Sequence, residues 1–566
     1  MRRALTLACL LLLGLPAVAS AHATLVSSEP ARGVTVREQP DEVVLRFSEP
    51  VEAAFGALRV VGADGKRVDD GSSGHPPGQP DALRVGLKDG IADGTYVATY
   101  RVISADSHPV SGGVVFNVGR PGAAPADVTK LITAEAGPVS KTAMKVVRGV
   151  AYLATAILAG GLIFLLIVWG PALRATGAGA AAAAAMQHRV RPILVGAAAV
   201  GAGATGLGLG LQAALASGAS LWQAVDADTF RELLKTNFGH AWAVRLIAFT
   251  VLGVLAAVAK PPGRRPVELV LGGLSVLALC ITPALAGHAR ATDPVWLNVA
   301  LDALHVAAMS AWVGGLVLLL AAVPAATRAL AARDRTRLLA AVLGRFSPLA
   351  MVSVAVLVLT GVVASIEHLT AVSDLWDSSW GRLVLAKIVL LLVLVGLGAV
   401  NQRRTMPRLR RLAEEGAPPG DDGRVLRATL RAEVALVVGA LAVTGILVGI
   451  SPPASAAGGP ASLERTVGPL ELQATLDPAR AGVNELHLYL LRRDGTPFTG
   501  TKELRVTAAL PSEQIGPLPA KPRRAGPGHY VIEALPLTPG GDWELAFSVR
   551  VSEFDQYDTR WKVSVR

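Results

Sequence analysis

The sequence contains little charge for its length. Of its 566 residues only 17% are charged, whereas 52% are hydrophobic and the mean hydropathy is +0.47. A soluble globular protein carries about a quarter charged residues. The hydrophobic surplus excludes a mainly disordered or nucleic-acid-binding chain, because neither buries so much apolar surface. The net charge of +11 therefore needs an explanation other than nucleic acid.

Cysteine is nearly absent. Cys9 lies in a candidate leader and Cys280 in an apolar stretch, so no intramolecular disulfide and no thiolate metal cluster are expected in the mature chain. The sequence also contains no Walker-type nucleotide-binding loop, which argues against direct drive by ATP. Methionine is missing between Met1 and Met144.

Residues 1–21 have the features of a secretory signal peptide: a basic start, a short apolar core and a small-x-small junction that ends at Ala21. Cleavage there makes His22 the new N-terminus. An N-terminal histidine offers an amine, an imidazole and a backbone nitrogen within chelating reach, a set suited to Cu(II) or Ni(II). Taken alone, His22 is more simply an incidental residue after a leader.

Two blocks show the period-two alternation of β-strands between Gly/Asp turns. Residues 22–118 predict an N-terminal all-β sandwich, followed by a Pro/Ala/Gly-rich linker over 119–142. Residues 462–566 predict a C-terminal all-β sandwich. Its two histidines, His487 and His529, show no metal-ligand spacing and are expected to be ordinary surface or half-buried residues.

The block between them, residues 143–451, contains eight apolar segments of about 20 residues, the length that a bilayer requires. We predict an eight-helix transmembrane bundle with spans near 146–170, 193–217, 241–259, 267–287, 297–323, 346–367, 381–401 and 430–450.

The connecting loops predict the orientation of this bundle. One alternate set of loops holds 19 arginines and lysines, and the other set holds three. Positive residues favour the cytoplasmic side, so a multi-pass protein of the cell (inner) membrane is expected. Both sandwiches then lie outside the cytoplasm, and the signal peptide independently requires this of the first.

Histidines gather toward the outer side of the predicted bundle. His240, His288 and His368 lie at outer ends of spans, and His305 lies about eight residues, or ~12 Å, inside the fifth span. Together they suggest a place where a metal ion enters the membrane.

The fifth span places Asp302, His305, Met309 and Trp312 on one helix face. Polar side chains at this depth mark a pathway or pair with one another, so an Asp302–His305 hydrogen bond that pins helices is an equal alternative. Met309 would suit Cu(I), or it simply packs between helices.

The N-terminal block resembles the copper-resistance protein family CopC. The resemblance rests on Ala21-His22-Ala23, on Leu45-Arg46-Phe47-Ser48-Glu49 and above all on residues 104–112, Ser-Ala-Asp-Ser-His-Pro-Val-Ser-Gly. It implies Cu(II) ligation by His22, Asp106 and His108, with Glu49 as a further ligand or neighbour.

Amine, imidazole and carboxylate donors independently favour Cu(II). An Asp-x-His pair on a strand presents both side chains to one face, whereas the alternative is a capped turn that ends a strand. Because the Met-rich loop of some CopC proteins is missing, we expect only Cu(II) in this domain, while the membrane block is open to Cu(I).

The membrane block resembles CopD, through Gly287-His288-Ala289, Leu304-His305 to Leu316, Arg345-Phe346-Ser347 and Trp380 to Lys387. Residues 462–566 resemble YtkA-like domains in pattern more than in motif. The chain thus looks like a CopC–CopD fusion with an added outer domain, which implies a copper-binding membrane protein of copper homeostasis and resistance.

The leading hypothesis is that the outer domain captures Cu(II) and passes copper to the membrane block for transport, most simply import. Expected partners are copper, the lipid bilayer and an extracytoplasmic donor or acceptor protein, with no nucleic acid and no catalytic site. Two alternatives stay open: a membrane redox protein (haem or copper reductase), and copper buffering or donation without net transport. Only His305 lies at a depth suited to haem ligation, which weakens the first alternative.

Overall fold

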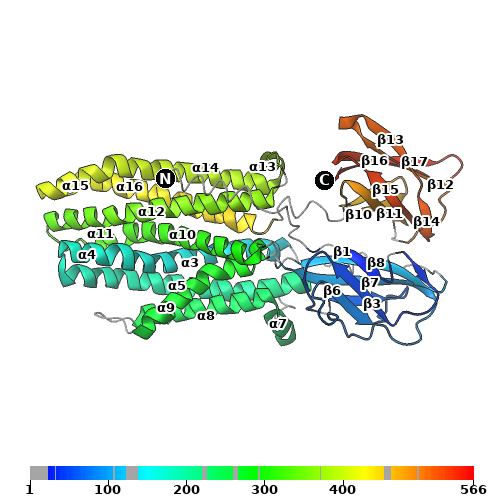
Figure 1. Ribbon diagram of the computed structural model, residues 1–566, viewed down its shortest axis with the longest axis horizontal. Coiled ribbons are helices and arrows are strands. Elements are labelled where there is room, and N and C mark those ends of the chain that lie inside the picture. Colours follow the sequence, from blue (N-terminus) through cyan, green and yellow to red (C-terminus); the bar gives the residue numbers. More distant parts are fainter. Residues whose placement is uncertain are drawn as a thin grey trace. The chain divides into compact units, whose positions relative to one another are not determined.

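The computed structural model describes residues 23, 25–31, 33–55, 57–105, 107, 109–120, 122, 138–218, 226–258, 266–290, 294–369, 371–450, 461–477, 479–493 and 496–565. Helices and strands separate into different parts of the chain (Figure 1). The predicted signal peptide, with Cys9, and His22 lie outside the described residues, so the leader and its cleavage remain predictions.

The N-terminal block forms two sheets. One has the order β1 (Leu25–Glu29), β3 (Glu42–Phe47), β6 (Ala82–Gly86). The other has the order β2 (Thr35–Val36), β8 (Pro109–Val118), β7 (Gly94–Ser104), β4 (Val51–Glu52), and β5 (Leu58–Val61) also pairs with β7. Inward residues of both sheets, such as Leu45 and Phe116, are fully buried in one core. The predicted N-terminal sandwich is confirmed.

Among the described residues, eight helices are long and apolar enough to cross a membrane, which confirms the predicted number. The first begins with α3 (Pro138–Ile163) and continues through η1 (Phe164–Trp169) and α4 (Gly170–Thr176). Five more follow as α5 (Gly179–Ser217), α8 (Asn237–Val258), α9 (Pro266–Leu285), α10 (Val295–Ala321) and α12 (Ala332–His368). The last two are α14 (Ser379–Val400), extended by η3 (Asn401–Thr405) and α15 (Met406–Glu415), and α16 (Gly420–Leu447). Helix α3 starts at Pro138, inside the range predicted as linker.

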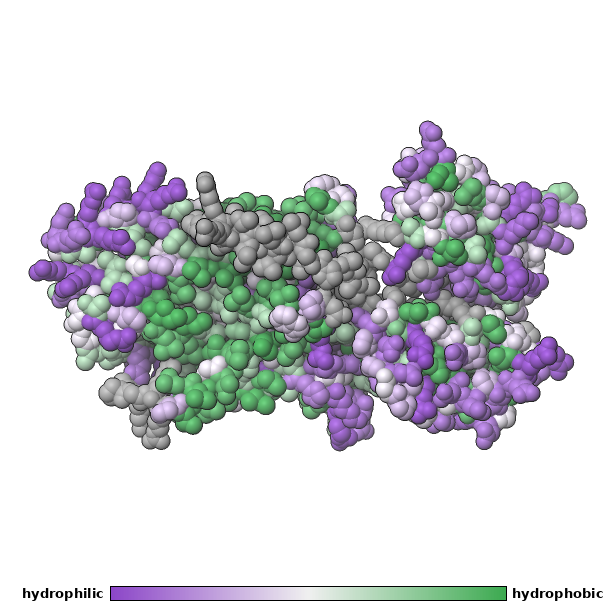
Figure 2. Space-filling model, viewed as in Figure 1, coloured by the Kyte–Doolittle hydropathy of each residue, from purple (hydrophilic) through white to green (hydrophobic). Residues whose placement is uncertain are grey.

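Apolar side chains cover the middle of this bundle, as a lipid-facing surface requires. Ile247 and Leu392 are each more than 60% exposed, and Figure 2 shows hydrophobic residues over the helices with hydrophilic residues at the end that carries α4 and α15. We call this end the arginine end, and the end where α8, α10 and α14 begin the histidine end. Short segments between the spans are α7 (Ala227–Leu234), η2 (His288–Arg290), α11 (Val323–Ala326) and α13 (Asp374–Asp377).

The C-terminal block is also built from two sheets. One runs β14 (Arg523–Gly526), β15 (His529–Leu537), β11 (Gly482–Arg492), β10 (Leu470–Asp477), β9 (Ala461–Val467). The other runs β13 (Ile515–Ala520), β12 (Glu503–Leu510), β16 (Gly541–Arg550), β17 (Gln556–Val565), with the short helix η4 (Pro511–Glu513) after β12. Leu488 and Trp543 are fully buried between the sheets. The predicted C-terminal sandwich is confirmed.

Candidate metal sites

Three chain segments meet at one end of the N-terminal sandwich. Strand β1 runs antiparallel to β3 so that Leu25 pairs with Phe47, and the preceding Ala23 is 2% exposed and packs into the core. Strand β4 pairs Val51 with Ser104, the last residue of β7. The N-terminal end of β1, the β3–β4 turn and the β7–β8 connection therefore converge. Of the predicted copper ligands, His22, Asp106 and His108 themselves lie outside the described residues.

Glu49, the fourth predicted ligand, contacts this connection directly. Its Oε1 accepts a hydrogen bond from the backbone N–H of Ala105 at 3.4 Å. The side chain is half-buried in the β3–β4 turn. This contact places a carboxylate next to the Asp-x-His motif, although 56 residues separate the two in sequence.

The centre of the Asp-x-His motif does not lie on a strand. Strand β7 ends at Ser104 and β8 begins at Pro109, and Ser107 between them is 4% exposed with a φ of +70°. A left-handed residue breaks the alternation that a strand would impose. The expectation of a strand at this motif is therefore wrong at Ser107, where the chain turns.

Gly112, the glycine of the same motif, lets two aromatic rings pack at this end. It pairs directly with Tyr100 across the hairpin, and an added Cβ would lie 2.6 Å from Cζ of that ring. The Tyr100 ring in turn meets Phe47 edge to face, with 5.3 Å between centroids. Any larger residue at position 112 would displace the ring that ties the hairpin to β3.

In the bundle, the predicted histidines occupy different places at the histidine end. His240 is exposed near the start of α8. His368 ends α12 and packs edge to face on Trp380 at 5.8 Å. For His288 only the backbone, in η2, is described. Among the described residues, no three His, Cys, Asp or Glu side chains converge in a way that could hold a metal ion.

His305 is anchored inside the bundle. Its Nδ1 lies 2.7 Å from Oγ1 of Thr360 on α12. That hydroxyl lies 2.8 Å from the carbonyl of Val356, and when it donates there, Thr360 accepts from His305 Nδ1–H. This tautomer leaves Nε2 as the nitrogen with a lone pair.

Two neighbours of His305 on α10 have different roles: Asp302 interacts with a charge, and Met309 packs in the core. Asp302 attracts the positive charge of Lys387 on α14, and the same charge also interacts with His305. Met309 is half-buried and packs against the core of the bundle, as the packing interpretation predicted. Trp312 is 7% exposed and lines a cavity farther along the helix.

The sequence interpretation missed two further charged side chains of the spans. Arg245 of α8 is 3% exposed, donates from Nε to Thr282 Oγ1 at 3.1 Å and stacks over Trp242. Glu433 of α16 is 4% exposed. A charged residue inside an apolar span is a functional signal in itself, so both could have been singled out from the sequence.

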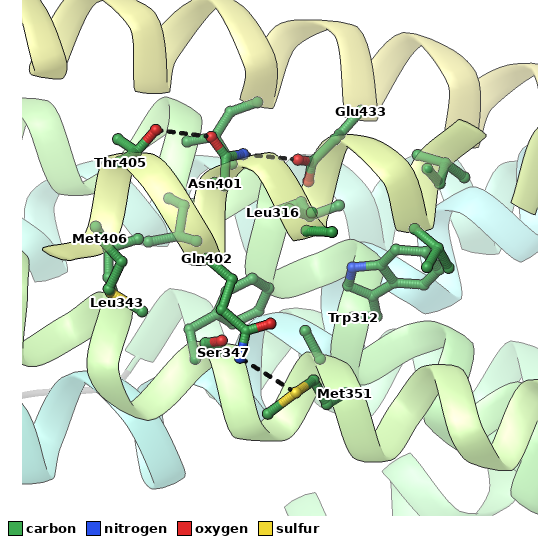
Figure 3. Close-up of a pocket in the computed structure, with 18 of the residues that line it drawn as sticks. Trp312, Leu316, Leu343, Ser347, Met351, Asn401, Gln402, Thr405, Met406 and Glu433 are labelled. Carbon is green, nitrogen blue, oxygen red and sulfur yellow. Dashed lines mark hydrogen bonds between the residues drawn. The ribbon is translucent and has the colours of Figure 1, made fainter. Parts of the chain in front are cut away.

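Glu433 belongs to a cavity of about 320 Å³ toward the arginine end. Figure 3 shows its polar wall: Asn401 Nδ2 donates to Glu433 Oε1 at 2.9 Å, and Gln402 Nε2 lies 3.4 Å from Met351 Sδ. Asn401 and Gln402 both belong to η3, a π-helical turn, and such turns frequently occur at functional sites. Met406 adds a second thioether to the lining. Carboxylate, amide and thioether groups thus face one cavity inside the bundle.

Comparison with known proteins matches three parts of the chain to family models. Residues 25–119 match the CopC domain, residues 139–296 the copper resistance protein D-like N-terminal domain, and residues 340–447 copper resistance protein D. These ranges end at residue 447, so the resemblance of the C-terminal sandwich to YtkA-like domains stays a prediction.

Individual proteins show the same similarity. The copper transport protein CutJ of Bacillus subtilis (strain 168) is 24% identical over 555 residues, which cover 97% of this chain and 96% of CutJ. Copper resistance protein C of Pseudomonas syringae pv. tomato is 31% identical over 107 residues, 18% of this chain and 84% of the relative. The crystal structure of CopC from Methylosinus trichosporium OB3b is 31% identical and covers 18% of this chain and 95% of that one, with a TM-score of 0.16.

Proposed function

This chain belongs to the copper-resistance family that joins CopC and CopD domains, and from that premise we propose that it captures Cu(II) outside the cytoplasm and passes copper into the bundle for import. Its relatives are named as copper transport and copper resistance proteins. Capture as Cu(II), the direction of transport and the location of both sandwiches outside the cytoplasm are parts of this proposal.

The observation that supports Cu(II) capture is that three chain segments meet at one end of the N-terminal sandwich. The pairings Leu25–Phe47 and Val51–Ser104 bring the first residues of β1 and the last residue of β7 to the turn between β3 and β4, which supports a site built from both segments. Donors that are far apart in sequence can then reach one ion, and amine, imidazole and carboxylate groups suit Cu(II). Glu49 supports the site because its carboxylate holds the backbone of that connection at Ala105.

After capture, copper must cross the bundle, and the bundle contains two polar sites that could bind it, which we call the first and second stations. His305, oriented by Thr360, provides an imidazole nitrogen toward the histidine end. The cavity with Glu433 and Met351 lies toward the arginine end and offers copper carboxylate, amide and thioether donors. Copper that enters at the first station and leaves through the second would cross the apolar layer between polar groups. Fusion to the capture domain raises the effective concentration of the copper donor at the first station.

Total cell copper at fixed external copper tests the proposal. Cells that express the wild type are expected to accumulate copper, and His108→Ala and His305→Ala are each expected to remove the increase. The exposed His75, whose Nδ1 lies 2.7 Å from the carbonyl of Ala82, gives the matched control His75→Ala, which should accumulate like the wild type. Copper that is unchanged or lower with the wild type would reject import.

Cu(II) affinity of the purified chain separates capture from transport. We expect His108→Ala to weaken Cu(II) binding by more than about 100-fold, because even an outer partner of a metal ligand contributes about 10–100-fold. His305→Ala should leave this affinity unchanged while it abolishes accumulation. An unchanged affinity in His108→Ala would show that the capture site is wrong.

A further inference from the structure

The cavity that contains Glu433 opens toward the bilayer. Three of its lining residues are exposed on the surface of the bundle: Met351 on α12, Val395 on α14 and Gln402 on η3. Met351 and Val395 are 49% and 40% exposed and lie within the apolar spans. Exposed side chains of a membrane span meet lipid. The cavity therefore has a mouth between α12 and α14, and the occupant of this mouth in a membrane is lipid.

Behind the mouth, the walls are mostly hydrocarbon. The cavity reaches Leu316 of α10 and Leu430 of α16, which are 1% and 4% exposed. Its main polar groups are paired with each other, since Asn401 Nδ2 donates to Glu433 Oε1 at 2.9 Å, on the side opposite Met351 (Figure 3). Water finds few hydrogen-bond partners along the remaining walls, whereas a hydrocarbon chain needs none. The cavity volume of about 320 Å³ is in the range of ligand pockets.

Two arginines lie between this mouth and the arginine end. Arg403 and Arg410 are both exposed and are seven residues apart, which places them toward one face of the continuous helix η3–α15. Nη2 of Arg410 would lie 3.7 Å from a Cβ added at Gly344, and Gly344 is seven residues, or about 10 Å, from Met351 along α12. Among the described residues neither guanidinium is paired with a carboxylate, whereas Arg424 at the same end is.

We propose that this cavity binds one acyl chain of an anionic glycerophospholipid, whose phosphate pairs with Arg403 and Arg410. Guanidinium groups form charge-assisted, often bidentate hydrogen bonds with phosphate, and basic residues beside a membrane span attract anionic lipids. The hydrocarbon walls suit the chain, and the two cations suit the headgroup about 10 Å away. The site goes beyond the proposed function and does not depend on it, because its contacts are the apolar walls and the arginines.

The fluorescence of Trp312 tests whether the chain enters. Trp312 lines the cavity and is only 7% exposed, so lipid at the outer surface of the bundle contacts it little. The emission of Trp312 is the difference between the full chain and its Trp312→Phe variant. Both are reconstituted in phosphatidylcholine vesicles that contain phosphatidylglycerol brominated on its acyl chains. Bromine quenches an indole on close approach, so we expect this emission to be lost.

Two glycines of α14 supply a matched pair of variants. Gly398 lines the cavity and Gly396 does not, and no atom lies within 4 Å of a Cβ added at either. Gly398→Leu should fill the cavity and restore the emission of Trp312, whereas Gly396→Leu should be quenched like the wild type. Quenching of Gly398→Leu to the wild-type level would overturn the proposal, because the chain would not occupy the cavity.

The headgroup is tested without altering the packed bundle. Brominated phosphatidylglycerol should quench Trp312 at a lower fraction of lipid than brominated phosphatidylcholine does. Arg403→Gln and Arg410→Gln should each reduce this preference about fivefold, and Arg424→Gln, whose arginine already has the partner Asp421, should keep it. These substitutions are on the surface, so the test stands even if Gly398→Leu does not fold. Equal quenching by the two lipids would overturn an anionic headgroup.

A soluble anion distinguishes a lipid from free phosphate. Glycerol phosphate has the phosphate chemistry of the headgroup without acyl chains, and we expect it to leave the quenching of Trp312 unchanged. Displacement of the brominated lipid by glycerol phosphate would show a site for free phosphate and overturn the lipid. Copper accumulation by cells tests the proposed function separately, since failure of the lipid site leaves that result unaffected.

Discussion

At the scale of single residues, Asp69 shows how the N-terminal sandwich uses one buried charge. The carboxylate is 2% exposed and accepts hydrogen bonds from the backbone N–H of Val60 at 2.9 Å and from Arg67 Nε at 3.2 Å. Burial alone raises the pKa of Asp69, but the bonds from Arg67 and Val60 outweigh it, so the pKa is lowered. The charged form is therefore the stabilising one in the folded domain.

The sign of this shift predicts loss of stability in acid. A folded-state pKa below the unfolded value of about 3.9 stabilises the domain above that pH, and the stabilisation disappears as the pH falls toward the folded-state pKa. We expect Asp69→Asn to lower local stability by about 2 kcal/mol at neutral pH, the contribution of hydrogen bonds to a charged group. Hydrogen exchange of the Val60 amide in the full chain measures the effect.

Asp64→Asn is the matched control for that experiment. Asp64 is exposed and pairs with the exposed Lys66 at 3.2 Å, an arrangement that contributes little to stability. Protection of Val60 in this variant should follow the wild type at every pH. A wild-type protection that does not change between neutral pH and pH 3, after correction for intrinsic exchange, would show that Asp69 does not carry the acid response.

The sequence identifies functional side chains where they lie together in a short motif. The Phe-Ser-Glu and Asp-x-His segments singled out Glu49, and in the structure its carboxylate accepts a hydrogen bond from Ala105, the residue before Asp106. The expectation that His487 and His529 are surface or half-buried residues is wrong, since they are 2% and 7% exposed. Their pairing was missed because 42 residues separate them, and only the register of β11 on β15 brings their rings together. Lys387 was noted for its resemblance to the family, whereas the electrostatic influence of Asp302 on it depends on the packing of two helices.

At the scale of elements, small residues bring two spans of the bundle into close contact. Helix α3 carries Ala156-x-x-x-Gly160 and helix α10 carries Ser310-x-x-x-Gly314, the small-xxx-small pattern of membrane helix pairs. A Cβ added at Gly160 would lie 3.0 Å from the Gly314 Cα, and one at Gly314 would lie 2.7 Å from the Gly160 Cα. The two backbones therefore touch, which fixes the helix that carries His305.

A side chain at this contact is expected to separate the helices. Gly314→Val should lower the melting temperature of the detergent-purified chain, because forcing extra carbon atoms into a packed contact costs about 1–3 kcal/mol. Gly203→Val on α5, where no atom lies within 4 Å of an added Cβ, is the matched control and should melt within a degree or two of the wild type. Equal melting of both variants would show that α3 and α10 do not meet at these glycines.

Elements were predictable wherever hydropathy or alternation alone determines them. All eight spans appear, because a bilayer selects for length and apolar composition. Their ends differ from expectation: α12 begins at Ala332 rather than near 346, since polar helical turns continue beyond the apolar layer. The π-helical turn η3, which supplies Asn401 to the cavity, leaves no signal in composition. Its shape depends on the helices packed around it.

At the scale of the whole molecule, the function requires a fixed orientation across the membrane. The proposed capture site and the histidine end must share one side, and the arginine end must face the cytoplasm. Loops with 19 positive residues against three support this orientation. Cys280 is 4% exposed and is the one cysteine beyond the predicted leader, so a single introduced cysteine can report sidedness.

Labelling of intact cells with a membrane-impermeant maleimide is the corresponding prediction. Arg231→Cys on α7 and Glu553→Cys in the C-terminal sandwich, both exposed, should react without permeabilisation, because both are proposed to face outward. Glu414→Cys on α15, also exposed, should react only after the membrane is opened. The unmodified chain, with buried Cys280, provides the background signal in both conditions.

Labelling at positions 231, 553 and 414 distinguishes an inverted bundle from a bundle with a different number of spans. If Glu414→Cys labels in intact cells while Arg231→Cys does not, the bundle is inverted and capture outside the cytoplasm is wrong. If Arg231→Cys labels but Glu553→Cys does not, α7 and the C-terminal sandwich lie on opposite sides, which the even number of spans between them does not allow. Labelling of the first two alone puts the proposed N-terminal copper ligands and His305 on the side from which copper arrives, as import requires.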